Sequence, residues 1–135
     1  MPLKFKVHRL PEFSSLKVVG EATLGDFVQL IDEMAEDSRR RGDKRLLVDL
    51  LDVGGELKFT EHFQMGERAA LRLQHLEKVA SVVPAAKITR TSEKVAQTHG
   101  LQLRVFTSMN EAIRWLSHTP GPRAEQQTAE PAKNT

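Results

Sequence analysis

The chain has 135 residues, of which 28% are charged, and a formal net charge of +2 with neutral histidines. This length predicts a single domain with one hydrophobic core, and the near-balanced charge argues against a polycation that binds nucleic-acid backbones. The chain has no cysteine, which excludes disulfides and thiolate chemistry. No stretch has the length and apolar character of a membrane span or a secretory leader, so we expect a soluble, cytoplasmic protein without membrane insertion.

The first predicted elements are two short strands joined by a tight connection. Apolar residues alternate with polar ones over residues 4–8, and a second apolar run follows over residues 16–20. Because so short a connection cannot make a parallel crossover, we expect the two strands to pair antiparallel as a hairpin. The outer strand would present an edge to another copy, as in a homodimer, although Lys4, Lys6 and Arg9 are charges that discourage such pairing.

An amphipathic helix follows, with apolar residues at helical spacing over residues 24–35. Thr23 and Asp26 precede this stripe at the spacing of a capping box, in a variant with the shorter acid. The helix should end at Gly42, after arginines 39–41, whose charges complement the partial negative charge of a helix C-terminus. The basic cluster from Arg39 to Arg45 either engages an acidic partner, anionic lipid or nucleic acid, or is only a solvated stop signal, which is the commoner case.

Residues 45–60 organise the rest of the predicted fold. Residues 46–53 form a near-continuous apolar run, the pattern of a central strand that is covered on both faces in a parallel sheet. A glycine pair at 54–55 ends this strand, and a second helix should begin near Thr60. Gly66 falls inside that helix, where glycine costs about 1 kcal/mol relative to alanine, so we expect a close approach of the helix to the sheet.

Further strands and helices complete the predicted order. The strands are residues 79–83 and 101–105, and the helices are residues 91–98 and 109–116. Ser108 and Glu111 form a capping box before the last helix. Residues 119–135 have little to bury and should be a disordered tail, which leaves residues 1–118 as the domain. The predicted fold class is α/β, with a mixed sheet of about five strands, antiparallel only at the N-terminal hairpin, and about four helices.

Three segments carry a resemblance to a known family. They are Leu-Leu-Val-Asp-Leu at 46–50, Glu-Lys-Val-Ala at 77–80, and Leu-Arg-Val-Phe-Thr-Ser-Met-Asn-Glu-Ala-Ile-Arg-Trp-Leu at 103–116. With the order of elements, they make residues 3–118 similar to the STAS superfamily, named for sulfate transporters and anti-sigma-factor antagonists. Within it the chain resembles the bacterial SpoIIAA-like group, often described together with Sec14-type domains. The resemblance implies a non-enzymatic regulatory module, in which the loop after the central strand and the following helix meet a protein partner.

Antagonist-type members of that superfamily carry an Asp-Ser-Ser-Gly-like stretch in this loop, and phosphorylation of its serine breaks partner binding. The loop of this chain, Asp-Val-Gly-Gly-Glu-Leu-Lys-Phe-Thr at 52–60, has no serine, so the family switch does not carry over. Thr60 is the only hydroxyl in the loop. It either caps the second helix, a role worth about 1 kcal/mol, or is a phosphorylation site, which is the less favoured interpretation.

The candidate contact surface follows from the position of this loop at the end of the central strand. Its residues are Asp52, Gly54, Gly55, Glu56, Leu57, Phe59, Thr60 and Phe63. Its apolar members, together with Met65, fit a protein-binding patch, a pocket for an apolar, lipid-like ligand, or ordinary core. We rank a protein partner first, since so short a chain would have to leave its only core partly hollow to hold a lipid.

Metal-binding and catalytic hypotheses have weaker support. Asp49, Asp52 and Glu56 could hold a hard cation such as magnesium, but their positions suit a strand interior and a turn better. The five histidines lack metal-ligand spacing, and the chain has neither a nucleophile elbow nor a phosphate-binding loop. We therefore expect no metal and no cofactor. An enzyme is the third class, with Asp52 and His62 as the residues to test, and the few aromatic residues leave no platform for single-stranded nucleic acid.

Overall fold

A computed structural model describes residues 3–21, 23–87 and 89–118 of the chain. In chain order the elements are β1 (Lys4–Arg9), β2 (Ser14–Glu21), α1 (Leu24–Arg41), β3 (Arg45–Gly54), α2 (Phe59–Arg72), β4 (Lys78–Val82), the 3-10 helix η1 (Ala85–Lys87), α3 (Thr91–Thr98), β5 (Leu103–Phe106) and α4 (Met109–Ser117). The predicted tail, residues 119–135, lies outside the described residues. Within the described part, no helix combines the length and the apolar character that crossing a membrane requires.

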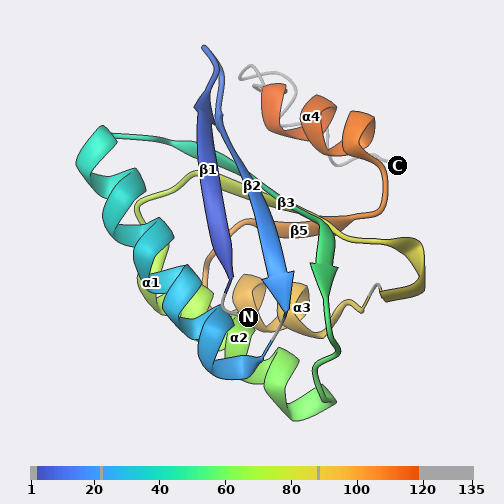
Figure 1. The fold of residues 1–135 in the computed structure, drawn as a ribbon. Helices are drawn as coiled ribbons and strands as arrows, with labels where there is room; N and C mark the ends of the chain where they lie inside the picture. The colour runs from blue at the N-terminus through green and yellow to red at the C-terminus, as the bar shows by residue number, and fades with distance from the viewer. Residues whose placement is uncertain (1–2, 22, 88, 119–135) are drawn as a thin grey trace, which may run out of the picture.

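The elements are arranged on one five-stranded sheet with the strand order β1-β2-β3-β4-β5 (Figure 1). β1 pairs antiparallel with β2, whereas the β2–β3, β3–β4 and β4–β5 pairs are parallel. The predicted N-terminal hairpin, the parallel remainder of the sheet and the central position of β3 are therefore confirmed. The mixed sheet with four described α-helices is the α/β fold that the pattern of elements predicted.

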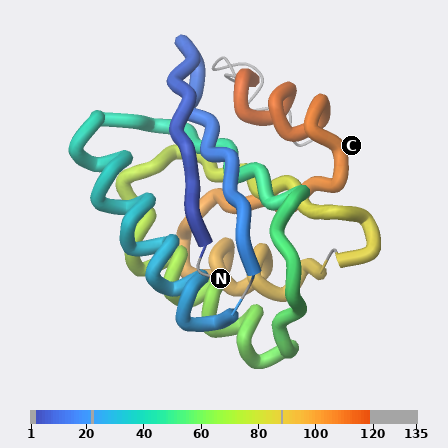
Figure 2. Tube along the Cα trace, in the orientation of Figure 1, coloured from blue at the N-terminus to red at the C-terminus, as the bar shows by residue number. Residues whose placement is uncertain are grey.

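Helices cover both faces of β3, but they do so unevenly (Figures 1 and 2). On one face, side chains of α1, α2 and α3 close the main core around Leu46 and Val48. On the other face, α4 packs over β3, β4 and β5, where Leu47 and Leu116 belong to one smaller buried cluster. Leu51, near the end of β3, is 38% exposed. The apolar run predicted for a doubly covered strand is thus doubly covered only in its first part.

Both ends of α1 and the start of α4 follow the predicted capping signals. The Thr23 hydroxyl accepts a hydrogen bond from the Asp26 N–H at 3.1 Å before α1, and Gly42 ends that helix in the left-handed conformation with φ 76°. Before α4, the Ser108 hydroxyl accepts from the Glu111 N–H at 3.3 Å. These local signals work because each satisfies backbone groups that have no partner inside the helix.

The start of α2 differs from the prediction. Its cap residue is Lys58, whose backbone N–H donates to the Glu61 side chain at 2.8 Å. Thr60 lies inside the first turn, so the prediction that Thr60 caps this helix is wrong. The reason is physical: Glu61 reaches back to the cap backbone, and the helix starts without a hydroxyl at the cap position.

Gly66 of α2 lies in close contact with α3. A Cβ atom at this position would lie 2.7 Å from the backbone oxygen of Ser92 and 2.9 Å from the Cβ atom of Val95. The sequence predicted a close approach of α2 to the sheet at Gly66. The close approach exists, but its partner is α3, and it holds the N-terminal turn of α3 in place.

We predict that Gly66→Ala destabilises the protein by about 1–3 kcal/mol, although alanine favours a helix, because its methyl group would overlap backbone atoms of α3. Gly25→Ala is the matched control, since Gly25 lies in the first turn of α1 and its Cβ would have nothing within 4 Å. That variant should be neutral or stabilising by up to about 1 kcal/mol. Urea unfolding measures both free energies, and equal values would contradict the tight contact at Gly66.

Candidate functional site

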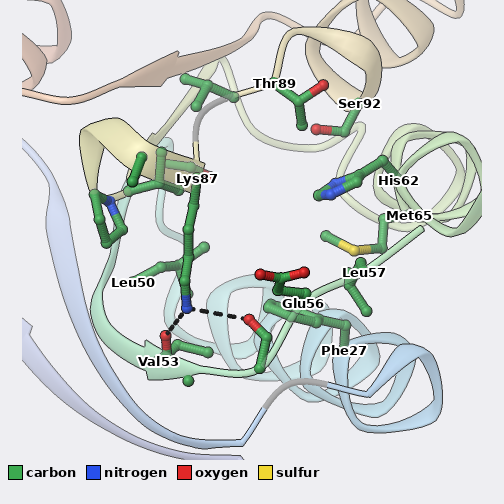
Figure 3. A pocket seen from close by; sticks show the side chains of 17 residues that line it. Phe27, Leu50, Val53, Glu56, Leu57, His62, Met65, Lys87, Thr89 and Ser92 are labelled. Carbon is green, nitrogen blue, oxygen red and sulfur yellow. Dashed lines mark hydrogen bonds between the residues drawn. The ribbon is translucent and has the colours of Figure 1, made fainter. Parts of the chain in front are cut away.

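A pocket opens at the carboxyl ends of the parallel strands, where the sequence predicted a site (Figure 3). Its volume is about 330 Å³, near the lower end of the roughly 300–1,000 Å³ typical of small-molecule sites. Its walls come from α1, β3, the β3–α2 loop, α2, β4 and the segment after it, the start of α3, and β5. Residues that line it include Phe27, Leu50, Val53, Glu56, Leu57, His62, Met65, Lys87, Thr89 and Ser92.

One part of the pocket wall is apolar. Phe27 of α1 and Val53 of β3 are buried members of the main core, and Leu57 and Met65 pack against the same core while remaining half-buried. These side chains reach the pocket because β3 turns outward at Gly54 and delivers the loop over the edge of the core. The apolar loop residues are therefore partly core and partly pocket wall, two roles that the sequence pattern left open.

Lys87 extends along one side of the pocket from η1 to the turn after β3 (Figure 3). Its ammonium donates hydrogen bonds to the backbone oxygens of Val53 at 3.0 Å and Gly55 at 3.1 Å. Gly55 has φ 85°, in the left-handed region that glycine adopts without strain. The lysine thus joins two loops that are far apart in the sequence and holds the turn in one conformation.

His62 is a titratable aromatic group of the pocket and points inward from α2, beside Ser92 and across the pocket from Lys87 (Figure 3). Burial lowers the pKa of His62 below its usual value of 6.5, and the nearby Glu61 charge only partly offsets this effect. Neutral imidazole is therefore favoured near pH 7, where it offers one hydrogen-bond donor and one acceptor. Among the described residues, no group of three His, Asp or Glu side chains lies close enough to hold a metal ion.

The predicted contact residues divide into two groups. Those that line the pocket are Gly54, Gly55, Glu56 and Leu57. Those that lie outside it are Asp52, Phe59, Thr60 and Phe63. The sequence analysis missed Lys87, Thr89 and Ser92, which carried no motif and reach the site only through the packing of η1 and α3.

Asp52 belongs to an ion-pair cluster on the sheet and not to the pocket. Its carboxylate lies 2.6 Å from the ammonium of Lys17, which also contacts Asp49 at 3.2 Å. The hydrogen bond to Asp52 is the largest of the effects that raise the pKa of Lys17. The structure does not bring Asp52 and His62, the two residues named for a catalytic test, together in the pocket.

Phe59 and Phe63 form an exposed aromatic pair on the outside of α2. Their exposed fractions are 69% and 43%, whereas the buried face of the same helix consists of Gly66, Ala69 and Ala70. Residues four apart in a helix lie one above the other on the same side. The pair therefore forms one apolar patch at the start of α2, directly after the pocket loop.

Comparison with known proteins defines the class of this domain. The family model for SpoIIAA-like proteins matches residues 14–117, so the chain belongs to the SpoIIAA-like family. Among solved structures, the chain is similar to an uncharacterised protein with a SpoIIAA-like fold from Shewanella loihica PV-4. That similarity has a TM-score of 0.53 at 15% identity and covers 85% of this chain and 94% of the other. No curated protein matches. The STAS-like resemblance is thereby confirmed at the level of family and fold.

The burial of His62 predicts how stability changes with pH. Because the pKa of His62 is lowered in the folded protein, the unfolded chain binds more protons at this residue when the pH falls below about 6.5. We predict that the free energy of unfolding decreases between about pH 7.5 and about pH 5.5, and decreases less in His62→Gln. Urea unfolding at both pH values measures this difference. The same pH dependence in the variant and in the parent chain would contradict the buried state of His62.

Proposed function

We propose that this SpoIIAA-like domain is a non-enzymatic regulatory module that binds a protein partner through the β3–α2 loop and the first turns of α2. The observation that carries this proposal is the aromatic pair, with Phe59 69% exposed and Phe63 43% exposed. Exposed aromatic side chains are frequent anchors of protein interfaces, because burying them on a partner removes much apolar surface from water at little cost in side-chain freedom.

The surroundings of the aromatic pair support a docking role. Lys58 at the N-terminal cap of α2 and Glu61 in its first turn lie next to the pair, so charged groups border an apolar centre, which is the usual anatomy of a protein interface. Lys87 already holds the adjacent turn through two backbone oxygens. A loop that is ordered before binding loses less conformational entropy when the partner arrives. The proposed surface is thus partly preorganised.

We predict that Phe59→Asp reduces partner affinity by roughly 30-fold or more, the loss typical of an interface anchor. An aspartate in the first turn of a helix is compatible with the helix dipole, so the variant should still fold. Leu71→Asp is the matched control, because Leu71 is also apolar and 69% exposed but lies near the other end of α2.

The measurement is quantitative affinity capture from a lysate of the native cells with the parent chain and both variants. Proteins retained by the parent chain and by Leu71→Asp, but lost with Phe59→Asp, support the proposal. An unchanged set of partners with Phe59→Asp contradicts it, as does an equal loss with both variants.

A second candidate function is a small carrier or sensor of an apolar ligand, and the pocket is the observation that favours it. A cavity of about 330 Å³ combines apolar walls at Phe27 and Val53 with polar groups from His62 and Lys87. Such a combination of apolar walls with a few polar groups is typical of sites that orient a small molecule. Because the volume is near the lower end of the range for such sites, this interpretation requires a small ligand.

For the carrier interpretation, native mass spectrometry of the purified protein should show a retained small molecule. Ala86→Trp should abolish this extra mass, because Ala86 lines the pocket and an indole would fill it. Ala85→Trp is the control, since Ala85 is the exposed neighbour in η1 and does not line the pocket. A bare polypeptide mass for the parent chain, or the same bound mass in both variants, would count against the carrier.

A further inference from the structure

The two edge strands of the sheet differ in what their outward backbone groups meet. At the β5 edge, both outward groups of Val105 are satisfied by side chains near the start of α3. The Val105 N–H donates to Glu93 at 2.8 Å, and its carbonyl oxygen accepts from Arg90 at 2.8 Å. Farther along, the Gln97 amide donates to the backbone oxygen of Leu103 at 2.9 Å. A foreign strand would have to break these bonds to pair with β5, so this edge is closed.

The β1 edge is open by comparison. β1 spans Lys4–Arg9 and pairs with β2 and with no other described strand, which leaves it at the margin of the sheet (Figures 1 and 2). The free side of such a strand offers a row of backbone donors and acceptors that a further strand can use. Within the described residues, β1 is therefore the edge at which the sheet can be extended.

The two faces of β1 differ in chemistry. Phe5 and Val7 turn toward α1 and pack against the main core. Lys4, Lys6 and His8 alternate with them and are exposed on the opposite face. Lys17 of β2, the neighbour of Lys6, is already neutralised by aspartates of β3. The face that carries Lys4 and Lys6 is thus basic at the edge of the sheet.

On the α1 side, Phe5 borders a groove of about 510 Å³ with acidic walls. Its carboxylates come from α1 and are Asp32, Glu33, Glu36 and Asp37. Arginines of the chain pair with Asp32 and Asp37. Glu33 and Glu36 have no ion-pair partner in the described part of the chain, and Glu33 only accepts a hydrogen bond from Gln29 at 3.3 Å. These two carboxylates therefore remain available to basic groups of a strand beside β1.

We propose that β1 is a second docking site, which binds an extended segment of a partner protein by strand addition. The side chains of this segment alternate in charge along the strand. Basic side chains of that segment lie toward Glu33 and Glu36, and acidic side chains lie toward Lys4 and Lys6. Backbone hydrogen bonds to β1 supply affinity, and the alternating charges select the segment and its register. This edge is separate from the proposed Phe59 surface, so each can be tested without the other.

A second copy of the chain fits this edge less well. Antiparallel pairing of β1 with itself around Lys6 would place Lys6 opposite its own counterpart. Like charges directly opposite one another destabilise a strand pair. The same arrangement would bring the α1 grooves of both copies, with their unpaired Glu33 and Glu36, to one side of the extended sheet. The charge pattern thus favours a partner segment with acidic side chains opposite Lys4 and Lys6 over pairing with a second copy of the chain.

The test compares two peptides of equal composition by NMR titration of the isotope-labelled full chain. The first, Lys-Glu-Val-Glu-Lys-Glu-Val, places all acids on one face of a strand. The second, Lys-Lys-Val-Glu-Glu-Glu-Val, mixes the charges on both faces. We expect the first to bind roughly tenfold more tightly than the second, with shifts centred on the amides of β1. Equal affinities, no binding of either peptide, or shifts centred elsewhere would overturn the proposal.

Charge-reversal variants of the protein test the role of Lys4 and Lys6 in peptide binding. The double variant Lys4→Glu and Lys6→Glu should bind the first peptide roughly tenfold more weakly, because two cross-strand charge pairs become repulsive. Lys94→Glu is the control, since Lys94 is exposed on α3 and should leave affinity unchanged. Undiminished binding by the double variant, or an equal loss in the control, overturns the role of the β1 charges.

Backbone methylation of the peptide tests strand addition itself. Successive residues of a strand direct their N–H groups to opposite sides, so N-methyl groups on alternate residues block only one side. One of the two alternate methylation patterns should abolish binding and the other should preserve it. Tolerance of both patterns, or loss with both, would contradict strand addition.

A dimer of the free chain with protected β1 amides would assign the edge to a second copy and would equally overturn the proposal.

Discussion

The structure depends on the burial of β3 between two parallel neighbours. Leu46 and Val48 lie in the main core, and Leu47 lies in the smaller core under α4, so each successive residue contributes to one of two apolar interiors. Because β2 and β4 both pair parallel to β3, their carboxyl ends reach the same side of the molecule. That shared direction brings the β3–α2 loop, η1 and the start of α3 together around one pocket. A strand at the margin of the sheet would have left these loops apart.

Most of the fold was predictable because its signals are local. Thr23 and Ser108 are followed by the N–H groups that they cap, and the charge of arginines 39–41 and the freedom of Gly42 end α1. The predictions of the start of α2 and of the neighbour of Gly66 were wrong, because in both places the structure depends on a contact that the sequence pattern did not indicate. Glu61 caps the backbone of Lys58 and shifts the start of α2, and Gly66 touches a helix that is remote in sequence. No local pattern distinguishes an approach to the sheet from an approach to α3.

The position of the candidate pocket was predictable from the sequence, but the residues that line it were predictable only in part. Its place follows from the topology, since ligands and partners meet an open α/β sheet at the carboxyl ends of its strands. The sequence pattern could not separate residues that line the pocket, such as Leu57, from residues that face outward, such as Phe59. Both are apolar, and only the path of the turn decides between them. Lys87 was missed because its bonds to Val53 and Gly55 join segments more than thirty residues apart.

α3 links three features that the sequence analysis treated separately. Ser92 in its first turn meets Gly66 of α2 and also lines the pocket. Glu93, the next residue, is buried and binds both the Val105 backbone and Arg90, which closes the β5 edge. Without this short helix the pocket would lose a wall and the sheet would have two open edges. Because α3 closes the β5 edge, the strand addition proposed above would take place at β1, the opposite edge of the sheet.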